Sequence, residues 1–199
     1  MTGQINLDCE FGRMISMVAA DTRYSTFCEV GTWNGMGSTR CFYDGLSKRG
    51  GGMLYSIEGD PEMFKGAQRV WNQNPRVTLL YGTLHRDILS QGEIMAHPHF
   101  SKINDHYRLW YPTELRTTKE APVVSVPPCD VILLDGGEFS TRGDWKTLNH
   151  SELRVVFLDD TQVIKTHDIY EALKQSVEWT CPAENQNERN GWAMFVRNT

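Results

Sequence analysis

Short apolar runs alternate with helix-like patterns along most of the chain. The runs are rich in β-branched and aromatic residues, and we expect seven of them to be strands: residues 26–30, 53–57, 77–81, 131–134, 154–158, 178–182 and 191–197. Before the first run, Phe11, Met14, Ile15 and Val18 recur at helical spacing over residues 11–20. Strands that alternate with helices predict a parallel sheet with crossover helices on both faces.

Residues that start and stop helices divide this pattern into elements. Asp60 is expected to cap a helix that begins at Pro61 and runs to about residue 72. A capping box from Thr141 to Asp144 predicts a helix that runs to residue 148, and Thr166 is expected to cap another that ends near residue 177. The glycine-rich turn at 31–38 leads into a helix that we expect to end near residue 48.

Two segments of the chain depart from this alternation of strands and helices. The polar segment 183–190 is too short for a crossover helix, so the last two strands are expected to pair antiparallel. Residues 84–128 are too long for an ordinary connection and must hold extra structure or a lid. The fold class that follows is α/β, with a Rossmann-like, seven-stranded, mostly parallel sheet and an antiparallel C-terminal strand pair. We expect a single domain over residues 1–199.

Composition excludes several classes of protein. Of the 199 residues, 40% are hydrophobic and 23% are charged, and the formal net charge is -5. Acidic and basic residues are interspersed, which disfavours nucleic acid and anionic membranes as partners. No apolar run approaches the roughly 20 residues of a membrane span, and the N-terminus lacks the pattern of a secretory signal. The five cysteines form no Cys-x-x-Cys pair, so we expect reduced thiols and a cytoplasmic protein.

The most informative segment follows the first expected strand. It reads Glu-Val-Gly-Thr-Trp-Asn-Gly-Met-Gly-Ser over residues 29–38, with an acid at the end of the strand and three glycines before a helix. Ligands of open α/β sheets bind at the carboxyl ends of the strands, where glycines let the backbone approach them. The glycine spacing matches neither the dinucleotide fingerprint nor a Walker A loop. It indicates another nucleotide-like ligand, and tight strand-to-helix packing is the alternative.

Two further strand ends carry polar residues that suit a nucleoside. Glu58 ends the second strand, where an acidic side chain can accept both hydroxyls of a ribose. Thr83 follows the third strand, where a small polar residue can border an adenine ring. Each is otherwise an ordinary solvated loop residue.

Three carboxylates follow the fourth and fifth strands, namely Asp135, Asp159 and Asp160. Hard oxygen ligands of this kind suit Mg²⁺, Mn²⁺ or Ca²⁺. Consecutive strand residues point to opposite faces, so Asp159 and Asp160 can share an ion only if the chain leaves the strand there. The alternative is that Asp160 is a turn residue and Asp135 binds the amine of a cofactor.

In this order, these features resemble the class I S-adenosylmethionine (SAM)-dependent methyltransferases over nearly the whole chain. The residues that carry the resemblance are Glu29, Gly31, Gly35, Glu58 and Asp135, together with the reversed last strand. The resemblance implies SAM as cofactor, bound by Glu29, Gly31, Thr32, Trp33, Gly35, Ser38, Glu58, Thr83 and Asp135. A dehydrogenase-like domain and a non-catalytic nucleotide-binding module are the alternatives.

The carboxylates narrow the resemblance to the metal-dependent O-methyltransferases of the macrocin and catechol types. In those enzymes an Asp after strand four and an Asp-Asp or Asp-Asn pair after strand five hold Mg²⁺. The resemblance therefore implies Mg²⁺ or Mn²⁺ bound by Asp135, Asp159 and Asp160, with Asp135 also at the catalytic centre.

The catalytic base is where the sequence departs from the pattern. Macrocin-type enzymes carry Leu-Asp-Gly-Asp after strand four, and here Gly137 replaces the second Asp, which is the base in those enzymes. Glu138, next to it, and His167, after strand five, are the candidates that remain. The lysine that catechol-type enzymes carry near strand four is missing, and Lys146 is the nearest.

The implied reaction is O-methylation of a sugar hydroxyl, for example on a deoxyhexose such as rhamnose, with catechols as the main alternative acceptors. The insertion at 84–128 is expected to cover the acceptor site. Its aromatic cluster, which consists of His106, Tyr107, Trp110 and Tyr111, either binds the sugar or packs a short helix on the domain. The compact chain also resembles methyltransferase modules attached to glycosyltransferases in large algal viruses, which implies a glycan acceptor, a larger protein and the host cytoplasm.

Overall fold

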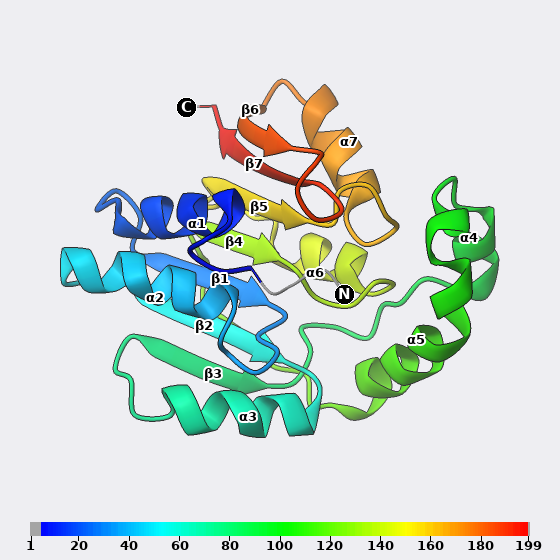
Figure 1. The fold of residues 1–199 in the computed structure, drawn as a ribbon, viewed down its shortest axis with the longest axis horizontal. Coiled ribbons are helices and arrows are strands. Elements are labelled where there is room, and N and C mark those ends of the chain that lie inside the picture. Colours follow the sequence, from blue (N-terminus) through cyan, green and yellow to red (C-terminus); the bar gives the residue numbers. More distant parts are fainter. Residues whose placement is uncertain (1–4, 199) are drawn as a thin grey trace.

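One seven-stranded sheet organises the chain (Figure 1). The computed structural model describes residues 5–198, apart from the side chain of Asn104. The strand order is β3-β2-β1-β4-β5-β7-β6, and β7 runs in the direction opposite to the other described strands. The strands are β1 (Thr26–Val30), β2 (Met53–Glu58), β3 (Val77–Tyr81), β4 (Val131–Leu134), β5 (Val155–Asp159), β6 (Trp179–Asn185) and β7 (Trp192–Arg197). The predicted fold class is confirmed.

Helices cover both faces of the sheet. They are α1 (Glu10–Ala20), α2 (Ser38–Arg49), α3 (Pro61–Trp71), α4 (Gln91–Ala96), α5 (Phe100–Glu120), α6 (Thr141–Leu148) and α7 (His167–Gln175). Side chains of β1 alternate between the two faces, so Phe27 packs with α1 and α2 whereas Cys28 packs on the side of α6 and α7. Among the described helices, none combines the length and apolar character needed to cross a membrane.

The expected element boundaries hold to within a few residues, with two corrections. The sixth strand was expected at 178–182, but β6 runs from Trp179 to Asn185 because its second half pairs with β7 beyond an irregularity between Thr180 and Ala183. The expected capping box at Thr141 is wrong. Ser140 is the N-cap of α6 and makes no side-chain capping bond, and Asp144 instead bonds a histidine.

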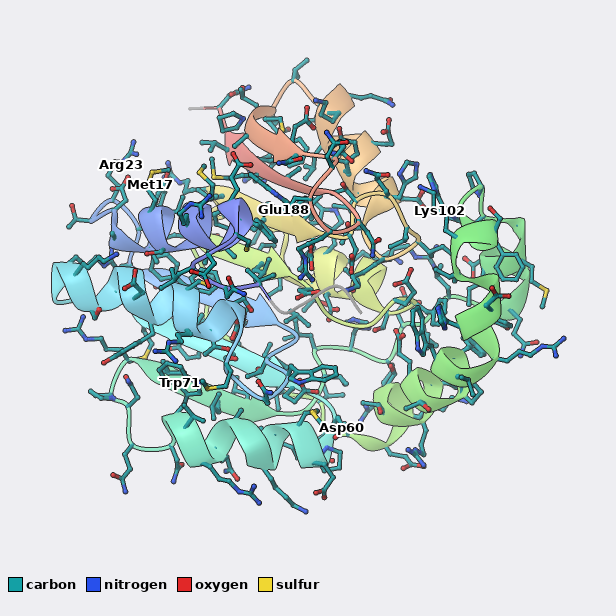
Figure 2. The ribbon with its side chains drawn as sticks, in the orientation of Figure 1. Met17, Arg23, Asp60, Trp71, Lys102 and Glu188 are labelled. Carbon is teal, nitrogen blue, oxygen red and sulfur yellow. The ribbon has the colours of Figure 1, made fainter. Side chains whose placement is uncertain are left out.

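The cap predicted for α3 is confirmed. The Asp60 side chain accepts hydrogen bonds from the backbone N–H groups of Glu62 and Met63, and Pro61 follows as the first helical residue. Asp60 and Trp71 mark the two ends of this helix in Figure 2.

The long segment at 84–128 holds α4 and α5, as the sequence requires. In Figure 1 these helices stand beside the ends toward which the parallel strands point. Tyr107 and Tyr111 of α5 are buried against Phe139, which lies in the loop after β4. The insertion is therefore packed beside the carboxyl ends of the strands, where the polar residues lie.

Candidate active site

A cavity of about 1410 Å³ lies at the carboxyl ends of β1, β2 and β4. Loops that follow these strands form its floor, and α5 forms one wall with Thr113, Glu114 and Thr117. The cavity combines two kinds of surface, one with glycines near β1 and one with charged groups near β4 and β5. Volumes of this order accommodate a nucleoside cofactor together with a small second ligand.

The loop after β1 packs tightly against the loop after β4. Gly31 has a φ of 99°, and a Cβ atom there would overlap the carbonyl oxygen of Asp135. Trp33 also has a positive φ, 54°, and its side chain is 56% exposed at the edge of the cavity. A non-glycine residue with positive φ stores strain, which is frequent at ligand sites.

Glu29 is enclosed within the fold and does not line the cavity. Its side chain has no exposed surface, and its carboxylate accepts hydrogen bonds from the hydroxyls of Ser38, Ser56 and Thr39. Burial raises the pKa of Glu29, and the three hydroxyls oppose that rise. This geometry corrects the expected contact between Glu29 and the cofactor, because the carboxylate instead ties the start of α2 to β1 and β2.

Glu58 does face the cavity, as expected for a residue that binds a ribose. One carboxylate oxygen accepts the backbone N–H of Trp33 at 2.6 Å and the other accepts that of Asp60 at 2.8 Å. Burial raises the pKa of Glu58 to about 7, although these backbone donors oppose the shift. Each oxygen retains acceptor capacity toward a ligand hydroxyl.

The remaining residues expected at the cofactor divide into two groups. Thr32, Ser38, Thr83 and Asp135 line the cavity with Gly31 and Trp33. Gly35 is not among the lining residues, because its backbone packs against Trp71, whose indole N–H donates to the Gly35 carbonyl at 2.7 Å.

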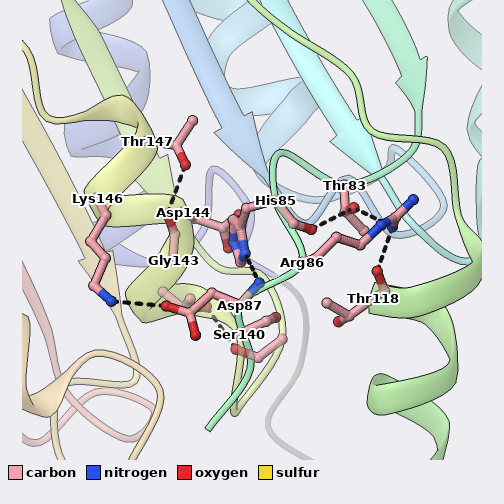
Figure 3. Close-up of polar contacts among 12 residues, drawn as sticks. Thr83, His85, Arg86, Asp87, Thr118, Ser140, Gly143, Asp144, Lys146 and Thr147 are labelled. Atoms are coloured by element: carbon pink, nitrogen blue, oxygen red, sulfur yellow. Dashed lines mark hydrogen bonds and ion pairs between the residues drawn. The ribbon is translucent and has the colours of Figure 1, made fainter.

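A histidine–aspartate pair that sequence reasoning missed lies beside Thr83 (Figure 3). The His85 Nε2 atom is 2.9 Å from Asp144 Oδ1, and the backbone N–H of Asp87 donates to His85 Nδ1 at 3.0 Å. These contacts assign the Nε2–H tautomer of the neutral ring, which donates to the carboxylate. His85 and Asp144 line the cavity and connect the loop after β3 to α6.

The structure brings together the three carboxylates that the sequence placed at one site. Asp135, Asp159 and Asp160 each offer an oxygen, and these oxygens lie within 4.8 Å of one another. The chain does leave the strand at the required point, because β5 ends at Asp159 and Asp160 has a φ of 59°. The chemistry of these donors alone suits a hard divalent cation.

Two cations of the chain itself already hold these carboxylates. Lys165 Nζ lies 2.9 Å from Asp135 Oδ1 and 2.6 Å from Asp160 Oδ2. Arg189 forms a fork on Asp159, with Nε 3.0 Å from Oδ1 and Nη2 2.7 Å from Oδ2. In this arrangement the residues do not fit a metal ion, because the ammonium of Lys165 lies between two of the three ligands and both oxygens of the third are engaged.

The same contacts, together with burial, shift the pKa values of Lys165, Asp160 and Asp159. Burial opposes the charge of Lys165, but Asp135 and Asp160 outweigh it and raise its pKa well above the ordinary value. For Asp160, burial would raise the pKa, and Lys165 outweighs this effect and lowers it. Burial and the neighbouring carboxylates Asp135 and Asp160 raise the pKa of Asp159, against the effect of Arg189. Lys165 is therefore a charged ammonium at neutral pH.

Glu138, one of the two candidate bases, lies in the cavity next to this cluster. Its Oε1 accepts the backbone N–H of Lys165 at 3.2 Å. Burial raises its pKa to about 7, with Asp160 and Glu114 adding to the rise and Lys165 opposing it. A carboxylate with this pKa exchanges protons near neutral pH, as a general base must.

The carboxylate of Glu114 lies beside Gly137, where the macrocin-type pattern has an aspartate. A Cβ atom on Gly137 would overlap its carboxylate, which accepts the backbone N–H groups of Phe139 at 2.8 Å and Ser140 at 2.7 Å. The second Asp of the macrocin-type motif would therefore clash with Glu114. The insertion, through α5, supplies a carboxylate here that no pattern around β4 could reveal.

His167, the other candidate base, is not among the residues that line the cavity. Its ring lies 4.1 Å from that of His99, centroid to centroid, and its Nδ1 is 3.1 Å from the carbonyl oxygen of Thr161. His167 is thus held at the start of α7 by His99 and by the backbone of Thr161. Of the two candidates, Glu138 is the one that lines the cavity.

The aromatic cluster of the insertion divides between a buried group and a group that lines the cavity. Tyr107 and Tyr111 are buried in the core beneath α5. His106 and Trp110 line the cavity and stack on one another at 4.5 Å, and Leu109 beside them is 71% exposed. One face of α5 therefore anchors the helix, and another presents rings to the cavity.

Comparisons with known proteins agree with this geometry at the level of the fold. No protein-family model matches the sequence, and no curated protein does. A Bacillus cereus O-methyltransferase solved with S-adenosylhomocysteine (SAH) is 16% identical, with a TM-score of 0.60, over 99% of this chain and 84% of that chain. TomG, an O-methyltransferase of Streptomyces achromogenes involved in tomaymycin synthesis and solved with SAM, is 15% identical, with a TM-score of 0.59, over 94% and 79%.

A third match comes from another organism. The Podospora anserina methyltransferase PaMTH1, solved with SAH, is 13% identical to this chain, with a TM-score of 0.57, over 94% of this chain and 78% of that one. At these identities the similarity establishes the Rossmann-like methyltransferase fold. Function has to be argued from the cavity.

Proposed function

We propose that this chain is a SAM-dependent O-methyltransferase that methylates a hydroxyl of a small acceptor. One observation carries the proposal: a single cavity joins the glycine loop after β1 and the carboxylate of Glu58 to a second carboxylate, Glu138, whose pKa is about 7. The first part suits a nucleoside cofactor and the second suits removal of a proton. The solved structures that share the fold, two of them with SAH and one with SAM, add support.

The residues near β1 and β2 fit the cofactor. Gly31 allows the backbone to pack without a side chain at the floor of the cavity, where Thr32 and Ser38 also lie. Glu58 would accept the ribose hydroxyls with the lone pairs that its two backbone contacts leave over. Thr83 and His85 line the cavity after β3, where the adenine ring would lie.

When bound, SAM supplies an electrophilic methyl group: the acceptor oxygen bonds to this carbon, the carbon–sulfur bond breaks, and the sulfur keeps its electron pair. The chain has to orient the acceptor and take up its proton. Glu138 is the group that would receive the proton from the hydroxyl. Holding the oxygen in line with the methyl group is a positioning effect that can contribute about 7–11 kcal/mol.

A sugar hydroxyl is the acceptor that the cavity suits best. Trp110, His106 and Leu109 offer an apolar surface on which the C–H face of a sugar ring can pack, and Glu138 and Lys165 offer polar contacts to its hydroxyls. Catechol remains the competing acceptor. A catechol would bind a metal ion through its two adjacent oxygens. Because Lys165 and Arg189 already engage the carboxylates that would hold this ion, a catechol acceptor has less support.

A methyl-transfer assay with a panel of sugars and catechols tests this function, combined with calorimetry of cofactor binding. We expect SAM to bind, NAD not to bind, and a sugar to gain one methyl group. Tight binding of NAD without SAM would support a dehydrogenase-like domain instead. SAM binding without turnover on any acceptor would support a non-catalytic module.

A further inference from the structure

The carboxylates after β4 and β5 form a closed ionic network with two basic residues of the chain. Lys165 contacts Asp135 and Asp160, and Arg189 contacts Asp159 through two hydrogen bonds. The exposed side-chain fractions are only 11% for Lys165, 15% for Arg189 and 0% for Asp159. Ion pairs shielded to this degree are screened little by solvent, unlike pairs at the surface.

The polypeptide around Lys165 is built to keep its ammonium in place. The backbone N–H of Lys165 donates to Glu138, and the neighbouring Thr166 hydroxyl donates to the Asp159 carbonyl oxygen at 2.7 Å. Asn190 Nδ2 donates to the second oxygen of Asp160 at 2.9 Å. Backbone bonds from Thr161 and Gln162 to the β6–β7 loop fix the same turn.

Cations of the chain itself occupy the places where a divalent ion would contact the carboxylates. Lys165 lies within ion-pair distance of Asp135 and Asp160, and Arg189 engages both oxygens of Asp159. Mg²⁺ requires oxygen ligands at about 2.0–2.1 Å in octahedral geometry. To bind it, Asp135 and Asp160 would have to release Lys165, and a buried ammonium without a partner is costly.

The position of Lys165 also suits a direct role. An ammonium has three N–H donors. Lys165 donates to Asp135 and forms an ion pair with Asp160, so these two carboxylates can engage two of the donors. Within the described part of the chain, no partner accepts from the third. Lys165 lines the cavity beside Glu138, where the acceptor hydroxyl would lie.

We infer that Lys165 takes the place of the divalent cation, so that this chain transfers methyl groups without a metal. The inference rests on the proposed function. As the oxygen–carbon bond forms, the hydroxyl proton passes to Glu138, and Lys165 keeps its three protons and stabilises the negative charge that develops on the oxygen. Asp135 and Asp160 position the ammonium, and Arg189 balances the charge of Asp159.

Binding of Mn²⁺, followed by the paramagnetic resonance signal of the free ion, tests this inference without any activity measurement. We expect the wild-type chain to bind no Mn²⁺ at about 1 mM. Lys165→Ala removes the ammonium and frees the carboxylates of Asp135 and Asp160, so it is expected to gain Mn²⁺ binding. Lys146→Ala is the matched control, because it breaks an exposed lysine–aspartate pair of 2.8 Å, between Lys146 and Asp87, neither of which lines the cavity.

Activity gives the second readout. The wild-type rate should be unchanged in excess EDTA, and Lys165→Ala should lose about 10²-fold or more in metal-free kcat, as when one oxyanion donor is removed from other enzymes. Lys146→Ala should keep the wild-type rate. Mn²⁺ binding by the wild-type chain, or a rate that EDTA abolishes and Mg²⁺ restores, would overturn the inference even if no variant folds. Failure of SAM to bind in calorimetry would instead contradict the proposed function.

Discussion

Gly31 lies against the carbonyl oxygen of Asp135 so closely that no side chain fits between them. The contact follows from strand register, because β1 and β4 are parallel neighbours in which Val30 lies opposite Leu134. The residues that come next on the two strands therefore meet at the floor of the cavity. Gly31 thus joins the cofactor half of the cavity to the half that carries Asp135 and the ionic network.

Substitution of Gly31 should disrupt the contact between these two halves of the cavity. Gly31→Ala places a methyl group on the Asp135 carbonyl in a backbone conformation with φ of 99°, so we expect at least a tenfold loss of SAM affinity and a loss of stability of about 1–3 kcal/mol. Calorimetry and urea unfolding measure the two effects. Gly51→Ala is the control, since a Cβ there meets nothing within 4 Å. Wild-type SAM affinity in Gly31→Ala would show that this contact does not shape the site.

Glu29 and Glu58 should behave differently when each is changed to glutamine. Glu29 contacts only hydroxyls inside the fold, so Glu29→Gln should lower the free energy of unfolding by about 1–3 kcal/mol because the new amide group faces hydroxyl donors. Glu58 faces the cavity, so Glu58→Gln should weaken SAM binding about tenfold, the value of one charged hydrogen bond. Urea unfolding and calorimetry on both variants test the distinction. If Glu29→Gln lost SAM affinity and kept its free energy of unfolding, Glu29 would belong to the cofactor site.

The rate should depend on pH through Glu138. As a base it acts when ionised, and its pKa of about 7 means that kcat at saturating SAM should rise between pH 6 and pH 8 and then level off. Lys165, Asp160 and Glu114 are the charged groups around it. Glu138→Gln should lower kcat by about 10²–10⁴-fold and remove the rise. Because Glu58 has a similar pKa, the measurement has to be kcat and not kcat/KM. An unchanged profile in Glu138→Gln would exclude this role.

Stability should also fall as pH rises through the same range. Burial raises the folded-state pKa of both Glu58 and Glu138 to about 7, above the usual value for a glutamate. The folded state therefore binds more protons than the unfolded state between these values, and the stability that this provides is fully present below the usual pKa and lost as pH rises through about 7. Thermal unfolding should show a lower Tm at pH 8 than at pH 6. The double variant Glu58→Gln, Glu138→Gln should reduce this difference.

The fold could be predicted because its signals are local. Each strand is a short apolar run, and the eight-residue, mostly polar segment between the last two runs leaves no space for a crossover helix, which predicts the reversed pair. The error in β6 arose because the strand continues through the polar residues Glu184 and Asn185, which pair with β7 but have no apolar pattern. Thr141 was expected to cap α6, but its hydroxyl donates to the Gly137 carbonyl instead.

The site could be predicted only in part because its key contacts join distant parts of the chain. The three carboxylates were found from their places after β4 and β5. No pattern near β4 could indicate Lys165, because it lies 30 residues from Asp135 along the chain. Arg189 and Glu114 come from a hairpin and from the insertion, and no local pattern connects them to β4 or β5. A lysine in the loop directly after Asp159 and Asp160 is the signal that could have been used.

The most direct test of the whole account is mass spectrometry of an acceptor panel incubated with SAM that carries a deuterated methyl group, in excess EDTA. We expect a sugar in the panel to gain one deuterated methyl group on oxygen while SAM is converted to SAH, and Glu138→Gln to form this product far more slowly. A product that forms only on catechol, or only when Mg²⁺ is added back, would contradict the acceptor or the role of Lys165. Absence of any methylated acceptor, with no SAM bound to the chain, would contradict the proposal that this chain is a SAM-dependent O-methyltransferase.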